Sequence, residues 1–335
     1  MAAPSAETGP NPCGLLHGQR IKSVHANGAH LPLNTPLNIH PLRGVLMVLG
    51  AAMLWGTTGT AQSLVPSTMS SLWVGALRLG VAALFFVIWV LVADRGVWTR
   101  QALRSPPWAL VLTAAGCMCV YNLAFFAGVR LLGVAVGTAV AIGSGPIWAG
   151  LLQALWLRRW PSALWWGGTV LAVCGVVLLV TANASVSGLS MPGLLLCLLT
   201  GLSYAVYALV SKDLVASVPA GRATALVFVC AALMAMPLAA ALAGLPTLQA
   251  GDVAVVAWLG IMSTGVAYLL LGFALRHIAG ATAVSLALAE PVTAFVLAVV
   301  VIGEQPGPVA LAGLMLVLAG LGLVIRTEVR GAGRA

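Results

Sequence analysis

The chain has 335 residues, of which 61% are hydrophobic and only 7% are charged. A soluble globular domain carries about 25% charged residues, so this composition cannot cover a water-facing surface and excludes an ordinary soluble fold. The formal net charge is +9. The basic residues stand singly or in small groups between apolar runs, which favours a membrane topology signal over a nucleic-acid-binding face.

Residues 1–42 differ from the rest because they are rich in Pro, Asn, Gly and His and poor in aliphatic residues. They lack the continuous apolar core of a signal peptide, so we expect a disordered cytoplasmic tail. Four of the five histidines lie in this tail, at spacings that build no obvious metal site. Five of the six cysteines lie in apolar runs and are expected to be free thiols. No metal or other cofactor is therefore expected.

From Gly44 onward the chain becomes a series of ten apolar segments, each about 20 residues long, which is the length needed to cross a hydrocarbon core of about 30 Å. Short separators containing Pro, Gly and Ser stand between them. The expected transmembrane helices cover residues 44–64, 72–93, 107–127, 134–157, 163–181, 192–210, 222–244, 252–272, 279–302 and 308–325.

Lysine and arginine residues are distributed very unequally between the two sides that this pattern defines. With the N-terminus inside, 14 of the 16 lie on the inside, Arg130 lies outside and Arg78 falls within the second span. Cytoplasmic loops carry an excess of Lys and Arg, so the distribution predicts a cytoplasmic N-terminus and a short cytoplasmic C-terminal tail at 327–335.

The two halves of the chain, 43–182 and 183–326, form an internal repeat. Four pairs of residues are each 145 positions apart: Pro146 and Pro291, Pro161 and Pro306, Gly168 and Gly313, Gly175 and Gly320. Five helices per half is an odd number, so the second half enters the membrane inverted. Inverted repeats are typical of secondary transporters that work by alternating access. We read the glycines as faces for close helix packing.

Several short motifs resemble the EamA-type branch of the drug/metabolite transporter superfamily. They are Leu54-Trp55-Gly56, Arg78, and the segment from Ala289-Glu290-Pro291 to Gly303-Glu304-Gln305-Pro306, and the resemblance covers residues 44–326. It implies an all-α bundle of ten transmembrane helices with both termini in the cytoplasm. It also implies export of amino acids, other metabolites or toxic compounds from a bacterial inner membrane. The first half departs from the pattern, since Gly145 corresponds to Glu290 and Arg159 to Glu304.

Four residues are expected near the middle of the membrane, where such transporters bind their substrates. Trp55, Tyr204, Pro146 and Glu290 each lie 11 to 12 residues into their spans, or roughly 16–18 Å deep at 1.5 Å per residue. A proline removes a backbone donor and frees a carbonyl group, so Pro146 and Pro291 are predicted to break their helices at the transport pathway.

Glu290 is the sharpest candidate, because a carboxylate at the bilayer centre is costly and marks a functional site by default. It could bind a substrate ammonium group or a coupling proton, or it could simply satisfy the backbone beside Pro291. Arg78 could extend toward the outer surface, hold a substrate carboxylate in the cavity, or pair with Glu290. If both face the pathway, the site suits a zwitterion such as an amino acid.

The aromatic pair Trp55 and Tyr204 could stack on a substrate or serve only in packing. Polar residues in the spans are further candidates for the cavity lining: Tyr121, Asn122, Gln153 and Tyr268, with Tyr207, Ser263 and Thr264.

The function predicted from the sequence is secondary export of a small metabolite or an amphipathic toxic compound, with exchange for protons as one option for coupling. Import or facilitated diffusion through the same fold is the alternative. The chain has no Walker-type motif and no His-Glu-x-x-His motif, and no histidine lies in a span, so ATP hydrolysis by that route and an intramembrane enzyme are disfavoured. A sensor would need an output domain. The expected partners are a small-molecule substrate, the lipid bilayer and protons, without nucleic acid. A monomer suffices because one chain holds both halves.

Overall fold

The computed structural model describes residues 40–63, 69–93, 106–156, 158–182, 190–246, 248–303 and 305–332. Within these residues the regular structure is helical throughout, and ten helical segments are long and apolar enough to cross a membrane. The predicted ten-helix fold is therefore confirmed. The predicted tail as far as residue 39, and Glu304, lie outside the described residues.

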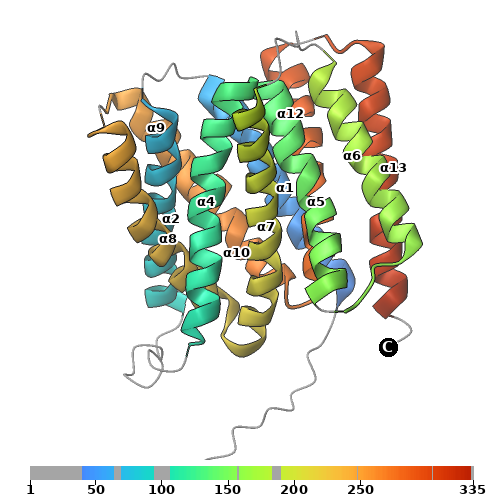
Figure 1. The fold of residues 1–335 in the computed structure, drawn as a ribbon, viewed down its shortest axis with the longest axis horizontal. Coiled ribbons are helices and arrows are strands. Elements are labelled where there is room, and N and C mark those ends of the chain that lie inside the picture. The colour runs from blue at the N-terminus through green and yellow to red at the C-terminus, as the bar shows by residue number, and fades with distance from the viewer. Residues whose placement is uncertain are drawn as a thin grey trace, which may run out of the picture. The chain divides into compact units, whose positions relative to one another are not determined.

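The first half provides five crossings, which can be followed in Figure 1. They are α1 (Pro41–Ser63), α2 (Ser71–Ala93), α4 (Trp108–Leu132), α5 (Val134–Trp156) and α6 (Ala163–Thr181). In the second half, three crossings are single helices, α7 (Met191–Ser217), α8 (Ala220–Ala243) and α13 (Pro308–Ala332).

The other two crossings of the second half change helix type along their length. The eighth consists of α9 (Ala250–Gly260), a π-helix η1 (Ile261–Val266) and α10 (Ala267–Ala274). The ninth consists of α11 (Gly280–Leu286), a 3₁₀ turn η2 (Ala287–Ala289), α12 (Glu290–Leu297) and a π-helix η3 (Ala298–Ile302).

All ten helices lie where the apolar segments predicted them, but several are longer. The sixth continues to Ser217 instead of 210, and the tenth to Ala332 instead of 325. The segment predicted as a C-terminal tail is therefore helical as far as Ala332. Apolar length reports only the part of a helix that meets hydrocarbon, so polar extensions beyond it are missed. At the other end, α1 already begins at Pro41, within the last residues assigned to the N-terminal tail.

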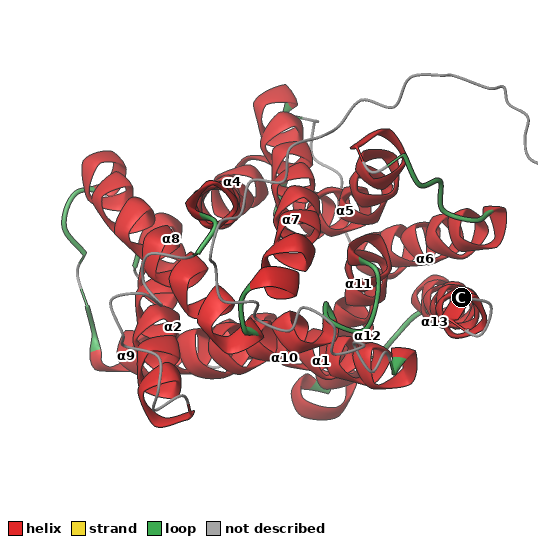
Figure 2. Ribbon diagram, turned by 90° about the horizontal axis from the view of Figure 1, so that it is seen from below, coloured by secondary structure: helices red, strands yellow, loops and turns green. Residues whose placement is uncertain are grey.

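The helices of the two halves pack against each other in a pattern that follows the repeat (Figure 2). The third crossing of each half packs against the first crossing of the other half, as α4 on α7 and α10 on α1. The second crossings, α2 and α8, pack together, and so do the fifth, α6 and α13. This exchange of partners between halves confirms the inverted repeat.

The α6–α13 contact is formed by the four glycines of the repeat. A Cβ atom on Gly175 would lie 2.7 Å from the carbonyl oxygen of Gly313, and one on Gly313 would lie 2.8 Å from that of Gly175. Gly168 and Gly320 meet in the same way seven residues, or about two helical turns, away on each helix. The predicted packing role of these glycines is confirmed, because the absence of side chains lets two backbones touch in lipid.

The two prolines of the repeat do not behave alike. At Pro291 the α-helix is interrupted, because the 3₁₀ turn η2 ends at Ala289 and Pro291 stands in the first turn of α12. Pro146, by contrast, lies inside α5, which runs without interruption from Val134 to Trp156. The predicted helix break at Pro146 is therefore wrong. Tight packing of α5 on α7 supports the helix there, since a Cβ on Gly201 would lie 2.9 Å from the Ala141 carbonyl oxygen.

Candidate functional site

A cluster of aromatic rings occupies the middle of the bundle. It contains all four tyrosines of the chain together with Trp55 and Phe228. The Trp55 ring centroid lies 5.2 Å from that of Tyr268 and 6.1 Å from that of Tyr204. Tyr204 in turn contacts Tyr121 at 5.6 Å. Trp55 and Tyr204 thus meet edge to face at an interplanar angle of 89°.

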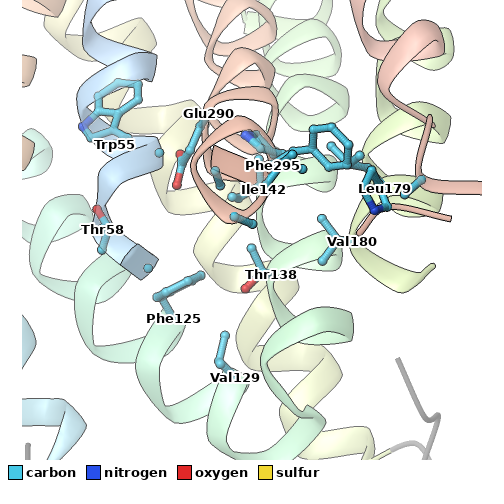
Figure 3. A pocket seen from close by; sticks show the side chains of 18 of the residues that line it. Trp55, Thr58, Phe125, Val129, Thr138, Ile142, Leu179, Val180, Glu290 and Phe295 are labelled. Atoms are coloured by element: carbon cyan, nitrogen blue, oxygen red, sulfur yellow. The ribbon is translucent and has the colours of Figure 1, made fainter. Parts of the chain in front are cut away.

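A cavity of about 620 Å³ begins beside this cluster (Figure 3). Its walls are mostly apolar and come from α1, α4, α5, α6, α12, η3 and α13. Phe125, Phe126 and Phe295 contribute aromatic surface, and Thr58 and Thr138 contribute hydroxyl groups. Glu290 is the only charged side chain among the described lining residues. Its carboxylate points toward α1, the helix that carries Trp55 and Thr58.

A second, much smaller cavity of about 30 Å³ lies among the aromatic rings themselves. Trp55, Tyr121, Tyr204 and Tyr268 form part of its wall, and Glu290 lines it as well. Four residues line both cavities, so the two spaces adjoin: Trp55, Phe125, Ile142 and Glu290. Glu290 therefore stands at the boundary between a roomy apolar space and a compact aromatic one.

The large cavity extends toward one face of the bundle. Its wall includes Gly59 near the end of α1, Val129 near the end of α4 and Pro306 just before α13. All these positions lie at the face opposite the start of α1 at Pro41 and the end of α13 at Ala332, because consecutive crossings alternate in direction. The cavity thus approaches one membrane face and ends in the interior at the aromatic cluster.

The face that carries the start of α1 is tied together by polar contacts between crossings. The Glu328 carboxylate on α13 accepts hydrogen bonds from the Ala279 backbone N–H at 3.0 Å and from the Thr282 hydroxyl at 2.6 Å. The Lys212 ammonium on α7 donates to the Leu275 carbonyl at 2.6 Å. These bonds join α7 and α13 to α11 and to the segment between α10 and α11 at this face.

The Glu290 carboxylate makes no hydrogen bond and no ion pair with the residues that the structure describes. Arg78 is near enough to interact with it electrostatically, yet lines neither cavity. The predicted alternative in which Glu290 pairs directly with Arg78 is therefore absent, as is a cavity-facing Arg78. Glu290 is half-buried, and its side chain lines the cavity wall.

Arg78 is instead anchored to the π-helix of the eighth crossing. The side chain is 7% exposed, and its Nε donates a 3.0 Å hydrogen bond to Thr264 Oγ1. The neighbouring Ser263 hydroxyl shares a 2.8 Å hydrogen bond with Thr58, which lines the large cavity. π-turns are frequent at functional sites. Here the π-turn links Arg78 on α2 to the cavity wall on α1.

Five other predicted lining residues line neither cavity: Asn122, Gln153, Tyr207, Ser263 and Thr264. Asn122 is 1% exposed, and its amide donates to the Met118 carbonyl one turn earlier, so it lines neither cavity. Gln153 lies in the last turn of α5, at the opposite end from the part of α5 that lines the cavities, and lines neither. Polarity within a span therefore does not by itself place a residue at the wall of these two cavities.

Sequence reasoning missed several residues of the two walls, notably Thr58, Phe125 and Thr200. A signal for them existed. Each lies one helical turn from a residue that was predicted, since Thr58 follows Trp55 by three positions, Phe125 follows Tyr121 by four and Thr200 precedes Tyr204 by four. Residues at these spacings share a helix face.

Within the described part of the chain, no group of three or more His, Cys, Asp or Glu side chains is placed to hold a metal ion. The five cysteines that the structure describes are free thiols, as predicted.

Comparison with known proteins identifies the family of this chain. The family model described as the EamA-like transporter family matches residues 42–181 and 191–326. The chain is 38% identical over 288 residues to the "Uncharacterized transporter YwfM" of Bacillus subtilis (strain 168). The aligned region covers 85% of this chain and 94% of the relative. A solved structure named only "Crystal structure of protein" has the same fold, with a TM-score of 0.74 at 21% identity over 86% of this chain and 98% of its own.

Proposed function

Because the chain belongs to the EamA-like transporter family, we propose that it exports a small metabolite or amphipathic toxic compound across a bacterial inner membrane by alternating access. In this proposal both termini are cytoplasmic, as the excess of Lys and Arg on that side favours. Amino acids and apolar organic compounds are the substrate classes considered first.

The observation that carries the proposal is the one-sided cavity. A space of about 620 Å³ approaches the face opposite the termini and ends at the aromatic cluster. On the other face, the bonds of Glu328 and Lys212 close the bundle. A substrate site that is open to one side and closed to the other is one end state of an alternating-access cycle. With cytoplasmic termini, this is the state that releases an exported substrate.

Glu290 is the proposed coupling residue. Its carboxylate faces the cavity without a protein partner, so it can hold either a proton or a substrate but not both at once. Exchange of one for the other would link outward movement of substrate to inward movement of protons down their gradient. Import on the same fold is the second candidate, and it would reverse this order.

The test uses purified full-length protein in liposomes loaded with a mixture of labelled amino acids and common metabolites. We expect efflux that an imposed pH gradient accelerates and that Glu290→Gln abolishes. The matched control is Asp213→Asn, which removes an exposed acid on α7 and should leave efflux unchanged. Equal efflux by wild type and Glu290→Gln would reject proton coupling through Glu290. Absence of movement of every compound by the wild type would reject the proposed substrates.

A further inference from the structure

We propose that the small aromatic cavity binds the ammonium head of an organic cation and that the large cavity takes the apolar body of the same molecule. The inference rests on the proposed transport function and names the substrate class for that site. It assigns different parts of one ligand to two adjoining spaces that share Trp55, Phe125, Ile142 and Glu290.

The charge of the lining supports a cation. Glu290 is the only charged side chain among the described residues that line either cavity, and no protein group in that part of the chain bonds it. An ammonium group would provide the missing partner for this carboxylate in a region of low dielectric. A zwitterion would also bring a carboxylate, for which these walls contain no Lys, Arg or His. Arg78 does not fill that role, because it bonds Thr264 outside both linings.

The aromatic walls support a cation independently of the carboxylate. Trp55, Tyr121, Tyr204 and Tyr268 all line the small cavity, and successive rings are 5.2 to 6.1 Å apart between centroids. A cation over such rings is attracted when it lies within about 6 Å of a ring centroid, and aromatic cages recognise ammonium ligands in this way. The Tyr204 hydroxyl is buried without a hydrogen-bond partner, so its oxygen can accept an N–H from the ligand.

The volumes of the two cavities indicate which part of the ligand each one holds. One water molecule needs roughly 10–15 Å³ of such space, so the small cavity of about 30 Å³ holds a group of about two non-hydrogen atoms. That is the size of a primary or singly methylated ammonium head. The large cavity of about 620 Å³, walled by Phe125, Phe126 and Phe295, suits an apolar and preferably aromatic body.

One feature favours an anionic group instead. The Trp55 indole N–H is buried without a hydrogen-bond partner, and an N–H donor could bond a ligand carboxylate. The proposal and this alternative predict opposite preferences between an amine and the amino acid that has the same body, so one pair of ligands separates them.

The experiment measures binding of three probes to the full-length protein in detergent by titration calorimetry at pH 7. Phenethylamine is the cation, phenylalanine is the same molecule with an added carboxylate, and 2-phenylethanol replaces the ammonium group with a hydroxyl. We expect phenethylamine to bind at least about tenfold more tightly than either of the others, since each tenfold step corresponds to about 1.4 kcal/mol. Equal or tighter binding of phenylalanine, or no binding of phenethylamine, would overturn the inference.

Variants test whether the ligand binds at the small aromatic cavity. We expect Glu290→Gln and Tyr204→Leu each to weaken phenethylamine binding about tenfold or more, and Tyr204→Phe, which keeps the ring but removes the hydroxyl, to weaken it less than Tyr204→Leu does. Tyr207→Phe is the matched control, because Tyr207 is buried in the cluster but lines neither cavity. Thermal unfolding of each variant confirms that it is folded. Unchanged binding by folded Glu290→Gln would overturn the inference.

The outcomes remain separable from those of the transport assay. Efflux of phenylalanine by a protein that does not bind phenethylamine would leave the proposed transport intact and reject the cation site. Binding of phenethylamine by a protein that moves neither phenethylamine nor any compound of the mixture would establish the cation site and reject the proposed transport function.

Discussion

The carbonyl oxygen of Gly168 on α6 lies 2.5 Å from the position that a Cβ atom on Gly320 of α13 would occupy. A Cβ there would also meet the backbone nitrogen of Ala172 at 2.5 Å. Both neighbours are backbone atoms, so they cannot move aside as the end of a flexible side chain can. Backbone contact between the fifth crossings therefore depends on the absence of side chains.

Gly320→Ala should consequently destabilise the protein. Overpacking a tight contact costs roughly 1–3 kcal/mol, and we expect a clear drop in the thermal midpoint measured in detergent. Gly322→Ala is the control on the same helix, because a Cβ at Gly322 would meet nothing within 4 Å. Equal midpoints for the two variants would show that the α6–α13 contact can separate without loss.

Removal of the Glu328 carboxylate should loosen the closed face. In Glu328→Ala, the Ala279 N–H and the Thr282 hydroxyl lose their acceptor. Hydrogen bonds to charged groups contribute about 1.5–3 kcal/mol, so we expect amide exchange in the first turn of α11 to accelerate about ten- to a hundredfold. Arg330→Ala, a change at an exposed residue on the same helix, should leave the exchange unchanged. Identical exchange in both variants would remove Glu328 from the closure.

Stability should fall on acidification because of His277, which lies between the eighth and ninth spans. Burial lowers the pKa of His277 below its ordinary value of 6.5, and the positive charges of Arg276, Arg43 and Lys212 and the neighbouring His40 lower it further. The unfolded chain then binds a proton at a higher pH than the folded protein does. Stability from the neutral imidazole is therefore complete above about pH 6.5 and decreases as the pH falls below that value.

The measurement is the thermal midpoint of wild type and His277→Gln between pH 8 and pH 5. Other groups titrate in the same range in both proteins, so the difference between the two curves isolates His277. We expect the wild type to lose more stability than the variant below pH 6.5. Parallel curves would contradict the assignment.

Thr264→Val should show whether the hydrogen bond that anchors Arg78 contributes to protein stability or to ligand binding. The variant removes the acceptor of the Arg78 Nε–H group while nearly preserving side-chain volume. A buried donor left without a partner costs about 1–3 kcal/mol, and more when it is charged. We expect a lower thermal midpoint but unchanged ligand affinity, because neither Arg78 nor Thr264 lines a cavity. A lost affinity with an unchanged midpoint would instead place Arg78 in the binding process. Thr113→Val, which changes an exposed threonine, serves as the control.

The sequence was sufficient to predict the ten crossings, the inverted repeat and part of the cavity wall. Apolar length and the charge asymmetry act over whole segments, so errors of a few residues do not alter the crossing count. Trp55, Tyr204 and Glu290 were found because depth along a span follows from counting residues, and all three line a cavity.

Contacts between crossings could not be predicted in the same way. Arg78 and Asn122 lie at plausible depths but on other helix faces, because depth carries no information about rotation of a helix about its axis. Gln153 lies in the last turn of α5, away from the part of that helix that lines the cavities. Glu328 was missed because it follows the end of the tenth predicted span at residue 325. Pro146 was misjudged because its local chemistry is that of Pro291, whereas packing of α5 on α7 determines the outcome.

The interruption of the ninth crossing at Pro291, without a counterpart at Pro146, has a consequence for the direction of flux. If the halves were equivalent, the empty carrier would face either side with equal free energy, and the rates measured with substrate on one side only would be the same in both directions. An interrupted helix and a cavity-lining acid that occur in only one half remove that equivalence. The carrier should therefore rectify, with different half-saturation concentrations for substrate on the two sides of the membrane.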